Sequence, residues 1–183
     1  MRVLVDETDV TQSVYAKKRI LLDTMILCYA HDRLSQYHGK ASVIVKASVG
    51  GLIKAYVSYQ NLLEFYSVMT GKRVKKPLTP GEAAELCGFY LKSVAITKLV
   101  PLSDMYCKAF ESAEELSIID GDIFDCVLAH TGKENVDTIW TENVRHFKQY
   151  NFVSVENPFE WKWEASKRAN QRNPHMRIHK HLS

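Results

Sequence analysis

The sequence lacks a long hydrophobic run. No stretch approaches the ~20 apolar residues that a membrane-spanning helix requires, and Met1 to Lys18 mixes acidic with basic residues where a signal peptide would be apolar. We therefore expect neither membrane insertion nor secretion, and we expect the protein in the cytoplasm.

Cysteine is scarce, and the four residues present form no C-x-x-C pair. A disulfide framework is therefore not predicted, and a zinc or redox role is the lesser alternative. Buried free thiols in a reducing compartment are the expected state of Cys28, Cys87, Cys107 and Cys126.

Excess charge of either sign is also absent, because the formal net charge is only +3. The molecule as a whole is not a strong binder of polyanions. Basic residues nevertheless gather in two places: the segment from Trp161 to Ser183 has six Lys or Arg against one Glu, and GKRVKK spans Gly71 to Lys76. Such clusters suit a phosphate backbone, and the plainer alternative is that they are solvated ends and loops.

The chain shows no internal repeat and no low-complexity linker. Its 183 residues, 46% of them hydrophobic, suffice for one well-packed domain. We predict this domain at residues 18–157, between an N-terminal extension (1–17) and a basic C-terminal tail (158–183).

Short apolar runs alternate with stretches of helical periodicity. Strands are predicted at Ile20–Leu22, Ala55–Ser58, within Ile96–Leu102, at Asp137–Trp140 and at Phe152–Val155, and helices at Gln36–Val49, Tyr59–Thr70, Thr79–Ser93, Ser103–Leu116 and Asp122–Lys133. Thr79-Pro80 is typical of a helix start. Strands separated by helices of this length predict an α/β fold with a parallel sheet flanked by helices.

Polar residues stand where the strands end. Asp23 directly follows an apolar strand, Glu64 lies one turn into the helix after the second strand, and Asp125 lies in the helix before the strand Asp137–Trp140. Thr141-Glu142-Asn143 follows that strand. In open parallel sheets, sites form beyond the carboxyl ends of the strands, so we expect these residues to share a cleft.

Helical wheels predict which side of two helices faces the core. Glu64 lies away from an apolar stripe made of Tyr59, Leu62, Leu63 and Tyr66. Asp122 and Asp125 lie opposite an apolar arc made of Ile123, Phe124, Val127 and Leu128. Both helices therefore present an acidic face away from the predicted core.

Carboxylates that converge repel each other unless a cation lies between them. Oxygen ligands without a His or Cys cluster favour Mg²⁺ or Mn²⁺ over zinc, and such an ion suits the hydrolysis of a phosphodiester. Each acid also has a purely structural alternative. Asp122 could cap its helix with Asp125 in the first turn, Glu64 could be a surface glutamate, and Asp23 could cap the next helix.

Four segments in order resemble a known family. They are LLDTMILCYA (Leu21–Ala30), SYQNLLEFYSVMT (Ser58–Thr70), GDIFDCVLAHT (Gly121–Thr131) and TIWTENVRHF (Thr138–Phe147). Together they resemble the PIN domain, specifically the VapC-type toxin nucleases, over about residues 20–156. The resemblance implies a three-layer αβα sandwich around a parallel sheet, with carboxylates that bind Mg²⁺ or Mn²⁺ and cleave RNA.

The resemblance also implies roles by position. The catalytic acids would be Asp23, Glu64 and Asp125. These three would also bind the metal, together with Asp122. Supporting roles would fall to Thr24, Thr141 and Asn143. The family's fourth motif is Thr-x-Asp or Thr-x-Asn, so Asn143 here puts a neutral amide in place of a carboxylate. His146 precedes Phe147 where some members have Asp.

The functions that follow are a metal-dependent endoribonuclease, the toxin of a toxin–antitoxin pair, with an RNA substrate, a small antitoxin partner and a homodimeric state. A catalytically degenerate PIN module that binds RNA or protein is the alternative, as is an RNA-processing nuclease that is not a toxin. Predicted RNA contacts are Lys72, Arg73, Lys75, Lys76 and Arg145. The histidines of HMRIHKH (residues 175–181) are expected to bind metal only adventitiously, and Trp161 and Trp163 to pack rather than stack on bases.

Overall fold

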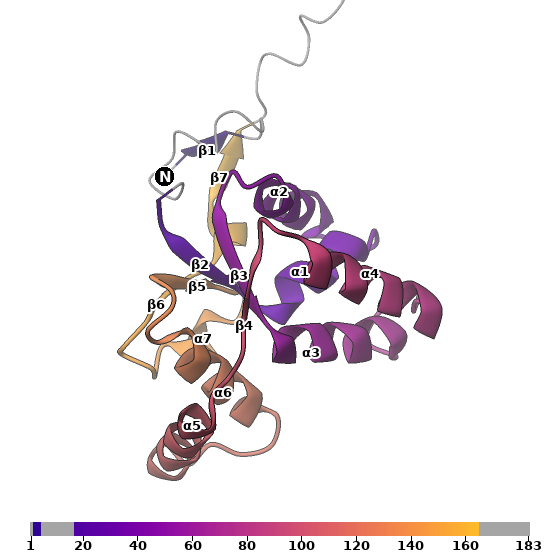
Figure 1. Cartoon of the computed structure of the whole chain (residues 1–183). Helices are drawn as coiled ribbons and strands as arrows, with labels where there is room; N and C mark the ends of the chain where they lie inside the picture. Colours follow the sequence, from indigo (N-terminus) through magenta and orange to yellow (C-terminus); the bar gives the residue numbers. More distant parts are fainter. Residues whose placement is uncertain (1, 5–16, 165–183) are drawn as a thin grey trace, which may run out of the picture.

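The central element is a five-stranded sheet in which every neighbouring pair is parallel, with strand order β4-β3-β2-β5-β6. The computed structural model of the chain describes residues 2–4 and 17–164 (Figure 1). The strands are β2 (Arg19–Leu22), β3 (Lys54–Ser58), β4 (Thr97–Leu99), β5 (Thr138–Trp140) and β6 (Ser154–Glu156).

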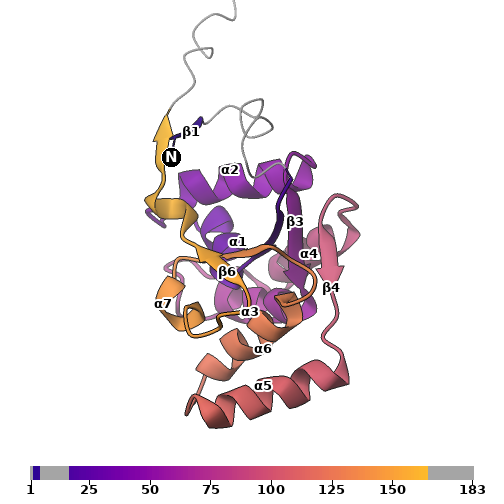
Figure 2. The ribbon, with the colours of Figure 1, turned by 90° about the vertical axis from the view of Figure 1, so that its left-hand side faces the viewer.

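Helices cover both faces of this sheet. They are α1 (Thr24–His31), α2 (His38–Val49), α3 (Tyr59–Thr70), α4 (Pro80–Lys92), α5 (Ser103–Glu115), α6 (Asp122–Gly132) and α7 (Val144–Phe147). Helices α1 to α4 form one layer, and α5 and α6 lie side by side in the other (Figure 2). The predicted α/β sandwich with a central parallel sheet is confirmed.

Strand β2 shows how the two layers are filled. Ile20 and Leu22 belong to the core under α1 to α4, whereas Leu21 belongs to the core under α5 and α6. All three side chains are fully buried, because successive strand residues point to opposite faces and both faces are covered. An apolar run without polar alternation is what such a strand requires.

Local signals explain where α3 and α4 begin. Thr79 caps α4 by accepting from the Glu82 amide, and the Glu82 carboxylate accepts from the Thr79 amide, with Pro80 at the first helical position. Ser58 and Asn61 form the same reciprocal arrangement at the start of α3. The predicted helix starts at Tyr59 and Pro80 are therefore confirmed.

The wheel predictions for α3 and α6 are partly wrong. Tyr59, Leu63 and Tyr66 are exposed, and so is Phe124, whereas Leu62 is buried as predicted. The buried face of α3 consists of Asn61, Leu62, Phe65, Val68 and Met69. The prediction placed Tyr59 and Tyr66 on the buried face because it considered hydrophobicity alone. It could not anticipate that the polar Asn61 faces the core.

One further prediction, the burial of all four cysteines, is partly wrong, and one helix was missed. The four cysteines are free as expected, but Cys107 is exposed and Cys87 only half-buried. The one-turn helix α7 was not predicted, since four residues are too few to show a period.

A second, two-stranded parallel sheet pairs β1 (Arg2–Leu4) with β7 (Lys162–Glu164), seen at the top of Figure 1. Before it, a short 3-10 helix η2 (Pro158–Glu160) buries Phe159 in the core, and Trp161 packs edge-on against Trp140. The packing predicted for Trp161 is thus confirmed. The domain boundaries stay predictions, and the 175–181 histidines, the Trp163 side chain and most of the tail lie outside what the structure describes.

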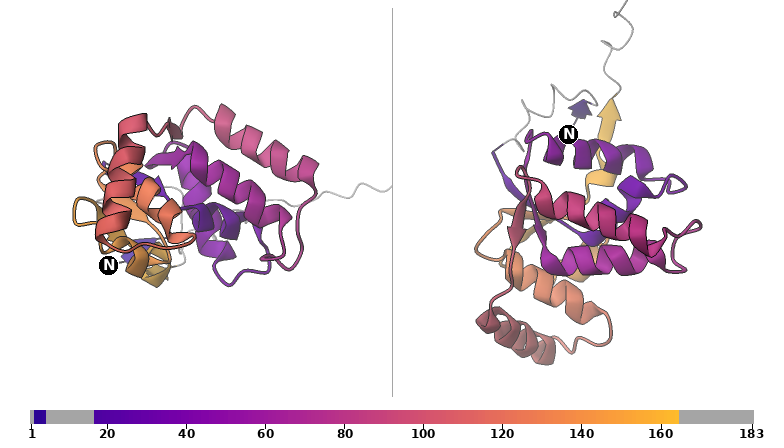
Figure 3. Two further views of the ribbon diagram at one scale, coloured as in Figure 1. Left: turned by 90° about the horizontal axis from the view of Figure 1, so that it is seen from below. Right: turned by 45° about the vertical axis from the view of Figure 1, so that its right-hand side comes forward.

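Figure 3 shows the same layers from below and in an oblique view with the right-hand side of Figure 1 brought forward. Within the described residues, no helix combines the length and apolarity needed to cross a membrane.

Candidate metal centre

The candidate site lies beyond the carboxyl ends of the adjacent strands β2 and β5, where the order in which the chain adds strands to the sheet reverses. The chain leaves β2 for β3 and β4 on one side and returns to β5 on the other, which is the position where open α/β sheets form sites. Asp23 follows β2 and Thr141 follows β5. The Thr141 hydroxyl donates to Oδ2 of Asp23 over 2.8 Å.

Asp23 is held rigidly and almost without water. Its amide donates to the Trp140 carbonyl over 3.0 Å, which continues the pairing of β2 with β5, and the residue is only 7% exposed. Asp23 occupies the residue before α1, yet its side chain makes no helix-capping hydrogen bond. The capping alternative for Asp23 is therefore wrong.

Glu64 is oriented by buried polar groups. Its Oε2 accepts from the Thr24 hydroxyl over 2.8 Å, and that hydroxyl accepts from Nδ2 of Asn61 over 3.0 Å. Asn61 is fully buried and is fixed by its capping exchange with Ser58. Glu64 is thus held within the fold, and the surface-glutamate alternative is wrong.

Gln60 connects α3 to α6. Its Nε2 donates to Oε1 of Glu64 over 2.6 Å and to the Phe124 carbonyl over 2.9 Å. One amide group therefore fixes the Glu64 carboxylate relative to the first turn of α6, which carries Asp122 and Asp125.

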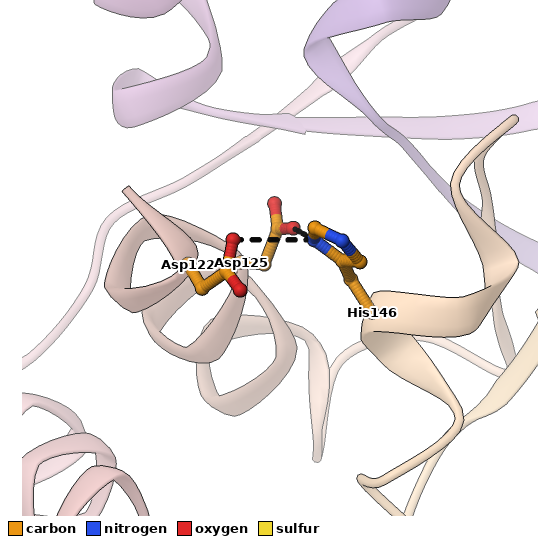
Figure 4. Close-up of side chains that lie close together, drawn as sticks. All are labelled: Asp122, Asp125 and His146. Carbon is orange, nitrogen blue, oxygen red and sulfur yellow. Dashed lines mark hydrogen bonds and ion pairs between the residues drawn. The ribbon is translucent and has the colours of Figure 1, made fainter. Parts of the chain in front are cut away.

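Asp122, Asp125 and His146 gather between α6 and α7 (Figure 4). Nδ1 of His146 lies 3.2 Å from Oδ2 of Asp125 and 3.3 Å from Oδ1 of Asp122. Both acids stand in the first turn of α6, where the helix dipole favours negative charge, but Gly121 and not Asp122 is the residue that precedes the helix. Helix-start stabilisation and site formation therefore coexist here.

The electrostatics show that the acids converge. Burial raises the pKa of Asp23 to about 7; the Thr141 hydrogen bond opposes this shift, and the charges of Asp125 and Glu64 add to it. Burial also raises the pKa of Asp125 to about 6; the His146 contact opposes the shift, and Glu64 and Asp122 add to it. The charges of neighbouring carboxylates thus add to the effect of burial in disfavouring the ionised forms of Asp23 and Asp125.

The donor set fits a divalent cation. Within residues 17–161, no Lys or Arg forms an ion pair with Asp23, Glu64, Asp122 or Asp125, so the protein's own described cations leave the acids uncompensated. Carboxylate oxygens with one imidazole nitrogen suit Mg²⁺ or a transition-metal ion.

The fourth motif contributes less than its position suggests. The Asn143 amide donates to the Thr141 hydroxyl over 2.9 Å, so its backbone supports the residue that holds Asp23, while Asn143 itself is exposed. Glu142 turns away, since its carboxylate accepts from the Tyr29 hydroxyl at 3.1 Å and the Tyr37 hydroxyl at 3.5 Å. It does not replace the missing fourth carboxylate.

The predicted RNA contacts separate into two places. Arg145 is exposed next to His146. Lys72, Arg73, Lys75 and Lys76 are exposed in the loop after α3. That loop begins seven residues beyond Glu64, which along a helix corresponds to about 10 Å, so it lies at the opposite end of α3 from the start of the helix.

Sequence reasoning missed three contributors to the site: Gln60, Asn61 and the inward orientation of His146. The S-x-x-N pattern from Ser58 to Asn61 was a usable signal for a capped helix start, although nothing in it shows that Asn61 also contacts Thr24. No local signal places His146 beside Asp125, because the contact depends on how α7 lies on α6.

Solved structures with the same fold are known, although no family model and no curated protein matches the sequence. The VapC20 toxin of Mycobacterium tuberculosis, which cleaves the sarcin–ricin loop, superposes with a TM-score of 0.57 at 16% identity over 75% of this chain and 99% of its own. VapBC-1 of Haemophilus influenzae gives 0.53 at 15% identity, covering 76% and 97%. FitAcB of Neisseria gonorrhoeae gives 0.52 at 18% identity, covering 77% and 99%. The resemblance seen in the four sequence segments is therefore confirmed at the level of the fold, and the chain has the PIN-domain fold of the VapC-type proteins.

Proposed function

We propose that the protein is an Mg²⁺- or Mn²⁺-dependent endoribonuclease and the toxin of a toxin–antitoxin pair. One observation carries the proposal: Asp23 is buried against the charges of Glu64 and Asp125, and no described Lys or Arg pairs with it. An ionised carboxylate in that position is costly without a cation. The fold shared with VapC20, a toxin that cleaves an RNA loop, supports RNA as the substrate.

The roles follow from the contacts. Asp23, Glu64 and Asp125 are the proposed catalytic ligands, with Asp122 beside them. Thr141 and Thr24 orient Asp23 and Glu64 through their hydroxyls, and Asn143 supports Thr141. A bound Mg²⁺ or Mn²⁺ supplies a Lewis acid for the phosphodiester and a means of making water nucleophilic near neutral pH.

Substrate contact is proposed for the exposed cations. Arg145 is exposed and directly precedes His146 in the chain, and we propose that it contacts a phosphate of the RNA. Lys72, Arg73, Lys75 and Lys76 would contact the RNA backbone farther along the chain. Contacts of this kind carry little sequence information, so they favour affinity over target choice.

Partners are proposed from the neighbours. The Haemophilus structure is of a VapBC pair, and a related FitAB assembly is bound to a DNA fragment, which supports a small antitoxin for this chain. We propose a homodimer in the cytoplasm, where RNA and antitoxin meet. Light scattering of the purified protein should give twice the mass of one chain, and a monomeric mass would refute the dimer alone.

The test is RNA cleavage by the purified protein in Mn²⁺ or Mg²⁺. Cleavage should stop in EDTA and in Asp23→Asn, and should persist in Asp104→Asn, which changes an exposed aspartate of α5. Cleavage at the wild-type rate in EDTA or in Asp23→Asn would show that another nuclease or another site is responsible.

Asn143 favours a second candidate, a degenerate module that binds RNA or protein without catalysis, because it removes one carboxylate from the fourth motif. Calorimetry distinguishes the two: a scaffold should bind no divalent ion more tightly than millimolar. A panel of transfer, ribosomal and messenger RNA with single-stranded DNA separates a toxin from an RNA-processing nuclease by which substrate is cut.

A further inference from the structure

His146 has an unusual position for a histidine on the surface of a helix. A single atom, Nδ1, lies within 3.3 Å of carboxylate oxygens from both Asp122 and Asp125 (Figure 4). The imidazole is mostly covered, with 26% of its side chain exposed, and Asp125 is covered to a similar extent at 24%. The three side chains therefore converge on one small volume between α6 and α7.

The separations match those of ligands around one cation. Two atoms at right angles about an ion with bonds of about 2.1–2.3 Å lie about 3.0–3.3 Å apart. The two measured separations, 3.2 and 3.3 Å, fall in this range, and all three candidate ligand atoms lie within 4.8 Å of one another. The same nitrogen contacts one oxygen of each carboxylate, as an ion ligated by all three side chains would require.

The nitrogen changes the chemistry of the centre. Mg²⁺ prefers oxygen ligands, whereas imidazole binds first-row transition-metal ions better. The fourth motif carries Asn143, whose neutral side-chain amide brings no negative charge to the site. His146 adds a donor from the same loop and helix, three residues later.

We propose that Nδ1 of His146 is a ligand of the divalent ion at Asp122 and Asp125, and that this nitrogen makes the centre prefer Mn²⁺ to Mg²⁺. The inference rests on the proposed metal-dependent function and deepens it by naming a ligand and a metal preference. His146 would then add a third ligand to the two carboxylates of α6.

Two substitutions test the role of the nitrogen. His146→Ala removes the donor. His146→Asp replaces it by an oxygen at the same number of bonds from Cβ as Nδ1, so the donor atom can occupy nearly the same place. His38→Ala is a matched control, because His38 is also half-buried but binds the Tyr29 carbonyl away from the acids. Thermal unfolding of each variant shows whether it folds.

The direct readout is pulsed electron paramagnetic resonance of Mn²⁺ bound to the full-length protein. A coordinated imidazole gives a ¹⁴N coupling that carboxylates and water do not give. The coupling should be present in the wild type and in His38→Ala, and absent in His146→Ala and His146→Asp. It should persist when His175, His179 and His181 are all changed to Asn, which removes the histidines near the C-terminus as a source.

Calorimetry gives the second readout. Loss of the nitrogen in His146→Ala should weaken Mn²⁺ binding by at least about tenfold, a factor typical of disturbed metal sites, and Mg²⁺ binding by less than about threefold. His146→Asp should bind Mg²⁺ more tightly than the wild type does, since it restores an oxygen.

The outcomes separate the two proposals. Mn²⁺ that binds the wild type without a ¹⁴N coupling, or equally well after His146→Ala, overturns the role of His146 and leaves the metal-dependent nuclease standing. A wild-type protein that binds neither ion overturns both.

Discussion

The two ends of the strand pair β2 and β5 each carry an aspartate, and the two aspartates differ in their exposure, in their hydrogen-bond partners and in the direction of their pKa shift. At the amino end, Asp137 accepts from the Arg19 side chain at 2.7 and 3.2 Å and from the Arg19 amide at 2.8 Å, largely in solvent. These hydrogen bonds hold the pKa of Asp137 below its ordinary value. At the carboxyl end, Asp23 is buried among acids, and its pKa is raised to about 7.

We propose that this difference separates a structural aspartate, Asp137, from a functional one, Asp23. Asp137 has a cation supplied by its own chain and joins two strands. The Asp23 carboxyl accepts from the neutral Thr141 hydroxyl, and no described Lys or Arg forms an ion pair with it. Strongly perturbed pKa values concentrate at functional sites, so the raised pKa of Asp23 supports this proposal.

The largest effect is expected from Asp23→Asn. The amide keeps the shape and can still accept from Thr141, but it loses the charge, so RNA cleavage should fall roughly a thousandfold or more. Metal-free Asp23→Asn should at the same time be more stable than the wild type at pH 8, by roughly 1–3 kcal/mol, because it removes a buried charge. Urea unfolding in EDTA measures this. A variant that is less stable than the wild type, and whose loss of cleavage is explained by unfolding, would show that Asp23 has a structural role like that of Asp137.

Thr141→Val should have the next largest effect. Valine keeps the volume but leaves Asp23 without its donor and the Asn143 amide without its acceptor. We expect about 1–3 kcal/mol of destabilisation from the lost buried hydrogen bonds and a 10- to 100-fold loss of cleavage or metal affinity. Thr138→Val, at the other end of β5, is the matched control and should leave cleavage unchanged.

The pH dependence of stability offers a finer test. Between about pH 4 and pH 7 the metal-free native state holds protons on Asp23 that the unfolded chain has released, so its free energy of unfolding falls as pH rises through that window. The free energies of unfolding of the wild type and of Asp23→Asn, measured in EDTA, should therefore differ more and more as pH rises, by a few kcal/mol at most. Saturating Mn²⁺ should abolish the divergence. Parallel curves would mean that the carboxyl of Asp23 titrates normally.

The smallest effect is expected from Asp137→Asn. The pair with Arg19 is exposed, and exposed ion pairs contribute little to stability. The melting temperature should fall slightly, more at low salt than at high salt, and cleavage should not change. A large loss of activity would show that the two ends of the strands are not independent.

The sequence predicted the fold better than the side-chain contacts. The apolar run before Asp23 and the Thr79 start of α4 depend on neighbouring residues, and these predictions are confirmed. The inward face of α3 depends on Asn61 finding Thr24 in another helix, and the wheel missed it. The approach of His146 to Asp125 likewise depends on the packing of α7 on α6. Hydrophobic periodicity predicts which face of a segment is buried, but it does not predict which polar side chains of other segments that face will contact.

The backbone of Asp23 has a consequence for how the protein responds to its ligand. Because its backbone amide donates to the Trp140 carbonyl, the main chain of Asp23 is fixed to the end of strand β5. If the proposed cation binds here, the metal-free carboxyl of Asp23 would take up a proton near neutral pH and release it when the ion binds. Loading the empty protein in weak buffer should therefore acidify the solution, with little change in the shape of the chain.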